Sequence, residues 1–242
     1  MSMYIDIHSH IMPGVDDGAH DLKESIAMLR IAEREGICKI ILTPHQKPDR
    51  KCVSKSGMEK RIVQLQSELE RLHMDIALYP GSELLYSKDL VERLTGGYVC
   101  TLAGSHYILV EFLPNEDWIY IRDGIYELAC AGYWPILAHV ERYVQFHERT
   151  ERIQELIDMG CYIQVNVGSL MGENGWATKW YCGRLIEKHL VHFIATDAHR
   201  DSGKRTPQMR KCAQWLTRKA GSDYAERLLW KNAEYILADT EL

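Results

Sequence analysis

Apolar runs of strand length alternate with amphipathic stretches along nearly the whole chain. The segment "DLKESIAMLRIAEREG" places Leu22, Ile26 and Leu29 at helical spacing, with Asp21 as a candidate N-cap and Gly36 at the C-terminal end. In contrast, "CKIILTP" and "HYILVEF" are short continuous apolar runs, which are typical of buried parallel strands. By these criteria we expect strands at 3–8, 38–44, 76–86, 106–112, 134–140, 161–168 and 191–196.

The alternation of strands and helices predicts an α/β fold in which helical crossovers join parallel strands. About seven such units fit one barrel of the TIM type, or a close variant, better than they fit two domains. We therefore expect a single domain over residues 1–242, with a helical C-terminal tail from about Pro207 onward. In barrels of this kind the active site forms at the C-terminal ends of the strands, so the residues found there are the first candidates for function.

Composition excludes several classes of protein. The chain has 242 residues, of which 46% are hydrophobic and 26% charged, and its net charge of -5 does not favour binding to a nucleic-acid backbone. No signal peptide and no apolar run long enough to span a bilayer are expected. The 7 cysteines never form a C-x-x-C pair, which indicates reduced thiols in the cytoplasm and argues against structural zinc on sulfur.

Polar side chains with an affinity for metals follow the predicted strands one after another. Alternation along a strand puts His8 and His10 on one face, and we expect the same of Asp197 and His199. Imidazole and carboxylate together suit zinc, manganese or iron, and a set of this size exceeds the needs of one ion. The candidate ligands are His8, His10, Asp17, His45, Glu83, Glu111, His139, Asp197 and His199.

In this order, "DIHSH", "TPH", "GSE", "LVEF", "HVERY" and "TDAH" resemble the motifs of the polymerase-and-histidinol-phosphatase (PHP) superfamily. More narrowly, the chain resembles the bacterial protein-tyrosine phosphatases of capsule and exopolysaccharide operons, from residue 4 to about Met209. The resemblance implies a distorted (β/α)7 barrel that holds three divalent metal ions, with manganese expected and iron or zinc as alternatives. Val140 stands where the family often has proline, which weakens the placement of Arg142 but not that of His139.

The resemblance also implies how the ligands are shared. One ion would take His8, His10, Glu83 and Asp197. A second would take Glu83 as a bridge, with Glu111 and His139. A third would take Asp17, His45 and His199, although the sequence also offers Asp16 in place of Asp17.

The chemistry that follows is hydrolysis of a phosphate monoester. Three divalent cations held by four carboxylates leave a net positive charge that matches a phosphate dianion. A metal-bound hydroxide would attack phosphorus, and Arg142 would hold the phosphoryl oxygens in a bidentate fork. The resemblance implies phosphotyrosine on a protein as substrate, in particular a bacterial tyrosine kinase that controls capsule synthesis.

Other functions remain open to test. The main alternative is a small-molecule phosphatase, such as one for histidinol phosphate. An amidohydrolase is disfavoured because it would need a lysine on a strand, and none of the strand ends offers one. A catalytically silent binding domain is disfavoured because it would be expected to lose some of the ligands. "CAQWLTR", from Cys212 to Arg218, matches the Cys-x5-Arg spacing of thiol phosphatases, but its bulky side chains favour a helix over a phosphate loop. Two further features each have two interpretations. Residues 172–181 form either a lid or partner surface, or a segment that packs locally. Arg200, Lys204 and Arg205 either contact a phosphopeptide or are solvated.

Overall fold

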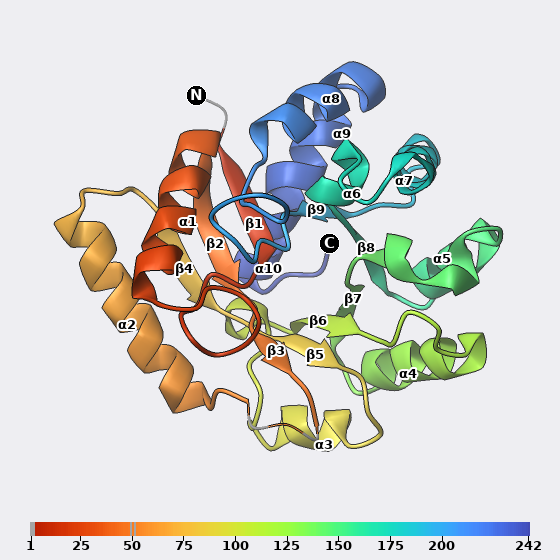
Figure 1. Ribbon diagram of the computed structural model, residues 1–242. Helices are drawn as coiled ribbons and strands as arrows, with labels where there is room; N and C mark the ends of the chain where they lie inside the picture. The colour runs from red at the N-terminus through yellow and green to blue at the C-terminus, as the bar shows by residue number, and fades with distance from the viewer. Residues whose placement is uncertain (1–2, 49, 51) are drawn as a thin grey trace.

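The strands of the described residues all pair in parallel and form two sheets that curl around a common centre (Figure 1). The computed structural model describes residues 3–48, 50 and 52–242, so positions 1–2, 49 and 51 of the predicted domain 1–242 lie outside the described residues. The first sheet has the order β1 (Tyr4–Ser9), β2 (Ile37–Leu42), β4 (Ala77–Pro80). The second has the order β3 (His45–Gln46), β5 (Glu83–Leu85), β6 (Tyr107–Glu111), β7 (Trp134–Leu137), β8 (Tyr162–Asn166), β9 (Phe193–Ala195).

The last strand returns to the first. Ser9 and Ala198 form a parallel bridge, and the backbone N–H of Asp197 donates to the carbonyl of His8 at 2.8 Å. Residues 189 positions apart in the sequence therefore lie side by side where β1 and β9 end.

Two of the expected strands are interrupted. The run 38–44 forms β2, which ends at Leu42, and pairing resumes in β3 just after Pro44, which has no N–H to donate to a strand neighbour. The run 76–86 divides into β4 and β5 at Gly81, where a Cβ would lie only 2.6 Å from Cγ2 of Ile41. The carbonyl of Pro44 then accepts a hydrogen bond from the N–H of Glu83, so both breaks lie next to each other and turn His45 and Glu83 toward the centre.

Helices lie around the strands in Figure 1. The predicted caps of the first are confirmed, since Asp21 accepts from the N–H of Glu24 and Gly36 has a left-handed φ of 91°. The helices that follow strands are α1 (Leu22–Glu35), α2 (Lys55–Arg71), α3 (Leu90–Thr95), α4 (Trp118–Cys130), α5 (Thr150–Asp158), α6 (Val167–Met171) and α7 (Trp176–Glu187), with short 3-10 turns η1 (Leu102–Gly104), η2 (Val140–Arg142) and η3 (Val144–Phe146).

The C-terminal segment consists of α8 (Arg210–Ala220), α9 (Ser222–Glu226), the π-helical turn η4 (Arg227–Lys231) and α10 (Asn232–Ala238). Residues Ala233 and Ile236 of α10 join a buried apolar cluster with Ile7 and Phe193 of the strands. A larger apolar cluster packs the strands against the surrounding helices. Apolar packing thus supports the strands, while the polar candidates gather at the strands' C-terminal ends.

The expected strand 191–196 is shorter than predicted, because β9 ends at Ala195. Asp197 adopts a left-handed φ of 50°, and strand alternation therefore does not explain why Asp197 and His199 lie together. His139, with a φ of 36°, likewise lies beyond β7 at the start of η2 instead of inside a strand. Two candidate ligands thus depend on left-handed turns that the sequence pattern did not predict.

Candidate metal centre

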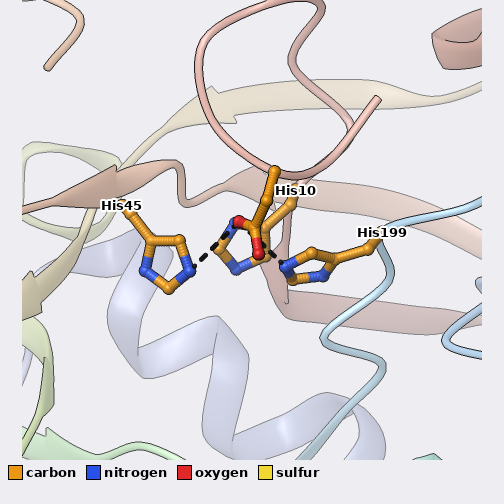
Figure 2. Close-up of side chains that lie close together, drawn as sticks. His10, His45 and His199 are labelled. Atoms are coloured by element: carbon orange, nitrogen blue, oxygen red, sulfur yellow. Dashed lines mark ion pairs between the residues drawn. The ribbon is translucent and has the colours of Figure 1, made fainter. Parts of the chain in front are cut away.

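All nine candidate ligands converge at the C-terminal ends of the strands. His8, from β1, and His10, just beyond it, approach His45 from β3, and Figure 2 shows His10, His45 and His199 turned toward one another. Three overlapping groups place one donor atom per residue within 4.8 Å of one another. They are His8 with His10 and Asp197; His10 with Asp17, His45 and His199; and His45 with Glu83 and Glu111.

The first group has the spacing that a metal ion imposes on its ligands. The Nε2 atoms of His8 and His10 lie 3.2 Å apart, and each lies 3.4 Å from Oδ1 of Asp197. Oε2 of Glu83 lies 3.4 and 3.2 Å from the same two nitrogens. Metal–ligand bonds of about 2.1 Å in tetrahedral geometry separate ligand atoms by about 3.4 Å. These four side chains therefore fit a shared divalent cation.

Hydrogen bonds orient the two histidines. Nδ1 of His8 lies 3.2 Å from Oε1 of Gln164, and Nδ1 of His10 lies 2.7 Å from Oδ2 of Asp16. Because both partners are acceptors, each Nδ1 carries the proton and each Nε2 presents a lone pair to the centre. Two lone pairs at this separation repel each other unless a proton or a metal cation lies between them.

The second group distinguishes Asp16 from Asp17. Oδ1 of Asp17 lies 3.4 Å from Nε2 of His45 and 3.6 Å from Nε2 of His199. Both carboxylate oxygens of Asp16 already have hydrogen-bond partners. Oδ2 contacts Nδ1 of His10 and accepts from the N–H of His45, and Oδ1 accepts from the N–H of Gly18. The geometry therefore favours Asp17 as a ligand and gives Asp16 a role in orienting His10.

The third group differs from the expected one. Nδ1 of His45 lies 2.9 Å from Glu83 and 3.0 Å from Glu111, whereas Nε2 of His139 lies 2.8 Å from Oε1 of Glu83 and 3.8 Å from Glu111. The imidazole of His45 thus faces Asp17 with one nitrogen and the two glutamates with the other. His139 remains within reach of Glu83, on the side away from His45.

Buried polar atoms at this place lack the hydrogen bonds that burial normally requires. Within the described part of the chain, Nδ1 of His45, Oε2 of Glu83, Oε1 of Glu111 and Nε2 of His199 are buried without a hydrogen-bond partner. Such atoms are costly unless another ligand satisfies them. Their convergence on the same centre is a second indication that the residues fit bound cations.

The electrostatics of the site favour positive charge. Burial lowers the pKa of His10, but the neighbouring carboxylates of Asp16 and Glu83 outweigh it and raise the pKa to about 9. Burial also lowers the pKa of His45, and Glu111 and Glu83 raise it to about 10. The pKa of His199 falls to about 4 through burial and the neighbouring His10. The carboxylates thus stabilise positive charge on the imidazoles, and the same negative charges favour metal ions, with which protons compete for the nitrogens.

Two arginines border the centre. Nη2 of Arg142 donates to Oδ2 of Asp197 at 2.5 Å, and Nη2 of Arg205 donates to Oδ1 of the same carboxylate at 2.7 Å. Asn166 also donates to Oδ2, at 2.7 Å. Both arginine side chains are about one-third exposed beside a buried carboxylate. A cavity of about 570 Å³ opens here, and Arg142, Asn166, Arg205 and Glu141 contribute to its wall.

Sequence reasoning did not single out Gln164, and it left the role of Arg205 open. Gln164 is a buried polar residue within the apolar run of β8, and this contrast was the available signal. Its side chain contacts Nδ1 of His8, accepts from the N–H of His139 at 2.8 Å and donates to Asn166. Arg205 follows the "TDAH" motif by only a few residues, but its contact with Asp197 depends on the turn between them.

The thiol alternative is wrong for this chain. Cys212 lies within α8, and Arg218 lies in the last turn of the same helix. Cys212 is buried, and burial raises the pKa of its thiol to about 12. A helix cannot turn its backbone N–H groups toward a phosphate held between these two side chains, and the thiol is neutral at ordinary pH.

The fold and the site define an α/β protein with parallel strands and a candidate metal centre at the strand ends. The chain belongs to the family described as "Capsular polysaccharide synthesis, CpsB/CapC", whose sequence model matches residues 4–238. This confirms the family expected from the strand-end motifs. None of the helices in the described residues combines the length and the hydropathy needed to cross a membrane.

Similar proteins match over nearly their whole length. The chain is 31% identical over 240 residues to tyrosine-protein phosphatase CpsB of Streptococcus pneumoniae, covering 97% of this chain and 98% of that one. It is 33% identical over 233 residues to tyrosine-protein phosphatase YwqE of Bacillus subtilis, covering 96% and 91%. A crystal structure from a study of YwqE and CpsB, described as "unique metal-dependent tyrosine phosphatases", superposes with a TM-score of 0.91 at 33% identity, over 98% and 95% of the two chains.

Proposed function

We propose that this protein is a metal-dependent phosphatase that removes phosphate from tyrosine side chains of a protein. The observation that carries the proposal is the cluster of His8, His10, Glu83 and Asp197, in which buried imidazole nitrogens and carboxylate oxygens converge with separations of 3.2–3.4 Å. The similarity to named tyrosine-protein phosphatases over nearly full length supports the same activity.

Three divalent ions, manganese in the first instance, are proposed. His8, His10, Glu83 and Asp197 would hold one, and Asp17, His45 and His199 another. Glu83, Glu111 and His139 would hold the third, with Nδ1 of His45 close by. Bound divalent ions supply Lewis acidity toward phosphoryl oxygens and lower the pKa of water.

The residues of the chain supply the remaining steps. Arg142 and Arg205 are placed to bind phosphoryl oxygens, because both side chains are partly exposed, border the cavity and lie beside the same carboxylate. Asp16 and Gln164 hold His10 and His8 in the tautomer that presents Nε2 to the centre. A tyrosyl leaving group has a pKa near 10, so it departs with little need for a general acid.

We also propose that the curled sheets form a distorted (β/α)7 barrel followed by a helical tail. Counting β2 with β3, and β4 with β5, as interrupted strands supports this description, as does the bridge from Ser9 to Ala198. The protein substrate proposed is a bacterial tyrosine kinase that controls capsule synthesis, in keeping with the family description.

The test compares substrates under controlled metal content. We expect the purified protein, loaded with manganese, to hydrolyse a phosphotyrosine peptide with a higher kcat/KM than histidinol phosphate, and a chelator to abolish both activities. Mass spectrometry of the metal should give three ions per chain, and Asp197→Asn should lower that number. Preference for histidinol phosphate, or activity that survives complete removal of metal, contradicts the proposal.

A further inference from the structure

Asp6 is a buried carboxylate to which the proposed metal centre gives no role. It lies on β1 two residues before His8, so both side chains project from the same face of the strand, and solvent does not reach it. A charged group at such a depth is costly unless it is paired or hydrogen-bonded. Asp6 is the first residue of "DIHSH", and its main partner is Thr196, the first residue of "TDAH". The two strand-end motifs therefore contact each other through residues that are not themselves candidate ligands.

Both carboxylate oxygens of Asp6 accept hydrogen bonds from Thr196. Oδ1 accepts from the N–H of Thr196 at 3.0 Å, and Oδ2 accepts from its hydroxyl at 2.5 Å. Oδ1 also accepts from the N–H of His8 at 3.4 Å. The hydroxyl oxygen of Thr196 accepts in turn from the N–H of Ala198 at 3.2 Å. Because a carboxylate and an N–H leave no other choice of donor, the hydroxyl hydrogen points to Asp6, and the hydrogen bonds run from Ala198 through Thr196 to the carboxylate.

These hydrogen bonds enclose the turn at Asp197. Thr196 and Ala198 flank Asp197, whose backbone has a left-handed φ of 50°. A residue other than glycine keeps this conformation only where the surrounding contacts determine it. Asp6 supplies such contacts on both sides of the turn, and the N–H of Asp197 donates to the carbonyl of His8 at 2.8 Å. The turn is thus bonded to β1 at the place where Oδ1 of Asp197 lies 3.4 Å from Nε2 of His8.

We propose that Asp6 is a positioning residue, which acts through Thr196 to hold Asp197 and His8 at the separation that a shared metal ion requires. The inference rests on the proposed function and adds to it a residue that would touch no ion. Asparagine could not do the same, because its NH2 group would face the hydroxyl of Thr196, whose hydrogen would then lose its acceptor. Residues that orient metal ligands matter, since replacing them typically costs about 10–100-fold in metal affinity.

The test measures manganese binding by equilibrium dialysis, with the bound metal counted by mass spectrometry. Thr196→Val replaces the hydroxyl with a methyl group of similar size and should weaken one binding step by roughly tenfold or more. Thr196→Ser keeps the hydroxyl and should bind manganese as the wild type does. Asp6→Asn should weaken the same step as Thr196→Val. The double variant should lose less affinity than the product of the two single losses, because both changes act through one contact.

The matched control is Tyr224→Phe, which also removes a buried hydroxyl. The hydroxyl of Tyr224 donates to the carbonyl of Val191 at 2.7 Å, and neither residue is a candidate ligand or neighbours one in the sequence. This variant should lower the melting temperature of the metal-free protein, because a buried carbonyl loses its donor, but it should leave manganese affinity unchanged. The control thus separates positioning of the ligands from a general loss of stability.

The inference is overturned if Thr196→Val loses stability but keeps its manganese affinity. It is also overturned by a Thr196→Ser variant that binds as weakly as Thr196→Val, by full additivity in the double variant, or by an equal loss of affinity in Tyr224→Phe. Wild-type protein that binds manganese but hydrolyses no phosphotyrosine peptide contradicts the proposed function alone, because the dialysis still decides the inference.

Discussion

Gly18 gives the sharpest test of how the loop after β1 positions the metal centre. A Cβ at this position would lie 2.0 Å from the carbonyl oxygen of His10 and 2.5 Å from its Cβ. Both contacts are with atoms that cannot rotate away. The same carbonyl accepts a hydrogen bond from the N–H of Ala19 at 3.0 Å, and the carboxylate of Asp16 accepts from the N–H of Gly18. The loop thus lies directly against the backbone of a candidate ligand.

Gly18→Ala therefore has to move the loop or His10 by roughly 1 Å, and a displacement of that size at a reacting centre costs on the order of 100-fold in rate. The overpacking itself should destabilise the fold by roughly 1–3 kcal/mol. Because Asp16 and Asp17 lie on the displaced loop, metal affinity should fall together with activity. The expected pattern is a chain that remains folded, binds manganese more weakly in calorimetry, and hydrolyses p-nitrophenyl phosphate about 100-fold more slowly.

The matched control is Gly183→Ala in α7. The nearest atom to its added Cβ is Cη2 of Trp215 at 3.9 Å, which is an ordinary contact. This change should stabilise the protein by roughly 0.5–1 kcal/mol, because alanine is the better helix former, and leave metal binding intact. If Gly18→Ala kept the metal affinity and rate of the wild type, the reasoning from close approach would be refuted.

Three further predictions concern Cys212, His192 and Asp197. Cys212→Ser should leave the rate within about twofold of the wild type, since a buried neutral thiol takes no part; a loss of several orders of magnitude in a p-nitrophenyl phosphate assay would restore the thiol mechanism. Burial lowers the pKa of His192 to about 4, so the unfolded chain binds more protons than the native chain between about pH 6.5 and pH 4. The free energy of unfolding should therefore fall as the pH drops through this window, by at most roughly 3 kcal/mol. His192→Asn keeps an acceptor for the N–H of Ile163 and should flatten that part of the curve in denaturant titrations; an identical pH dependence would exclude His192 as its source. Removing metal with a chelator should lower the melting temperature of the wild type more than that of Asp197→Asn, because ligand binding stabilises only the native state, and equal shifts would speak against Asp197 as a ligand.

The sequence predicted the clustering of the site better than its details. Parallel strands with a polar residue at each C-terminal end must bring those residues to one edge, and this held for His8, His45 and Glu111 regardless of small errors in strand limits. The reason given for Asp197 was wrong, because the left-handed turn there replaces the expected strand. Turns of this kind depend on tertiary contacts such as the hydrogen bond from Asp197 to the carbonyl of His8.

The residues that orient the ligands were harder to find. Asp16 and Asp17 are adjacent and chemically identical, and only the folded loop shows which one faces His10 and which one faces His45. Gln164 acts through His8 and His139, which come from other strands, so no local pattern identifies it. Sequence patterns identify residues at equivalent positions on successive strands, whereas contacts between loops can be identified only in the folded structure.

The pairing of β1 with the segment after β9 has a consequence for synthesis on the ribosome. His8 and His10 are translated well before Asp197, whose carboxylate completes their group and lies 187 residues after His10 in the sequence. A nascent chain therefore exposes two histidines long before it can enclose a cation with them. Metal loading becomes a late step, and a prematurely terminated chain should leave the ribosome without it.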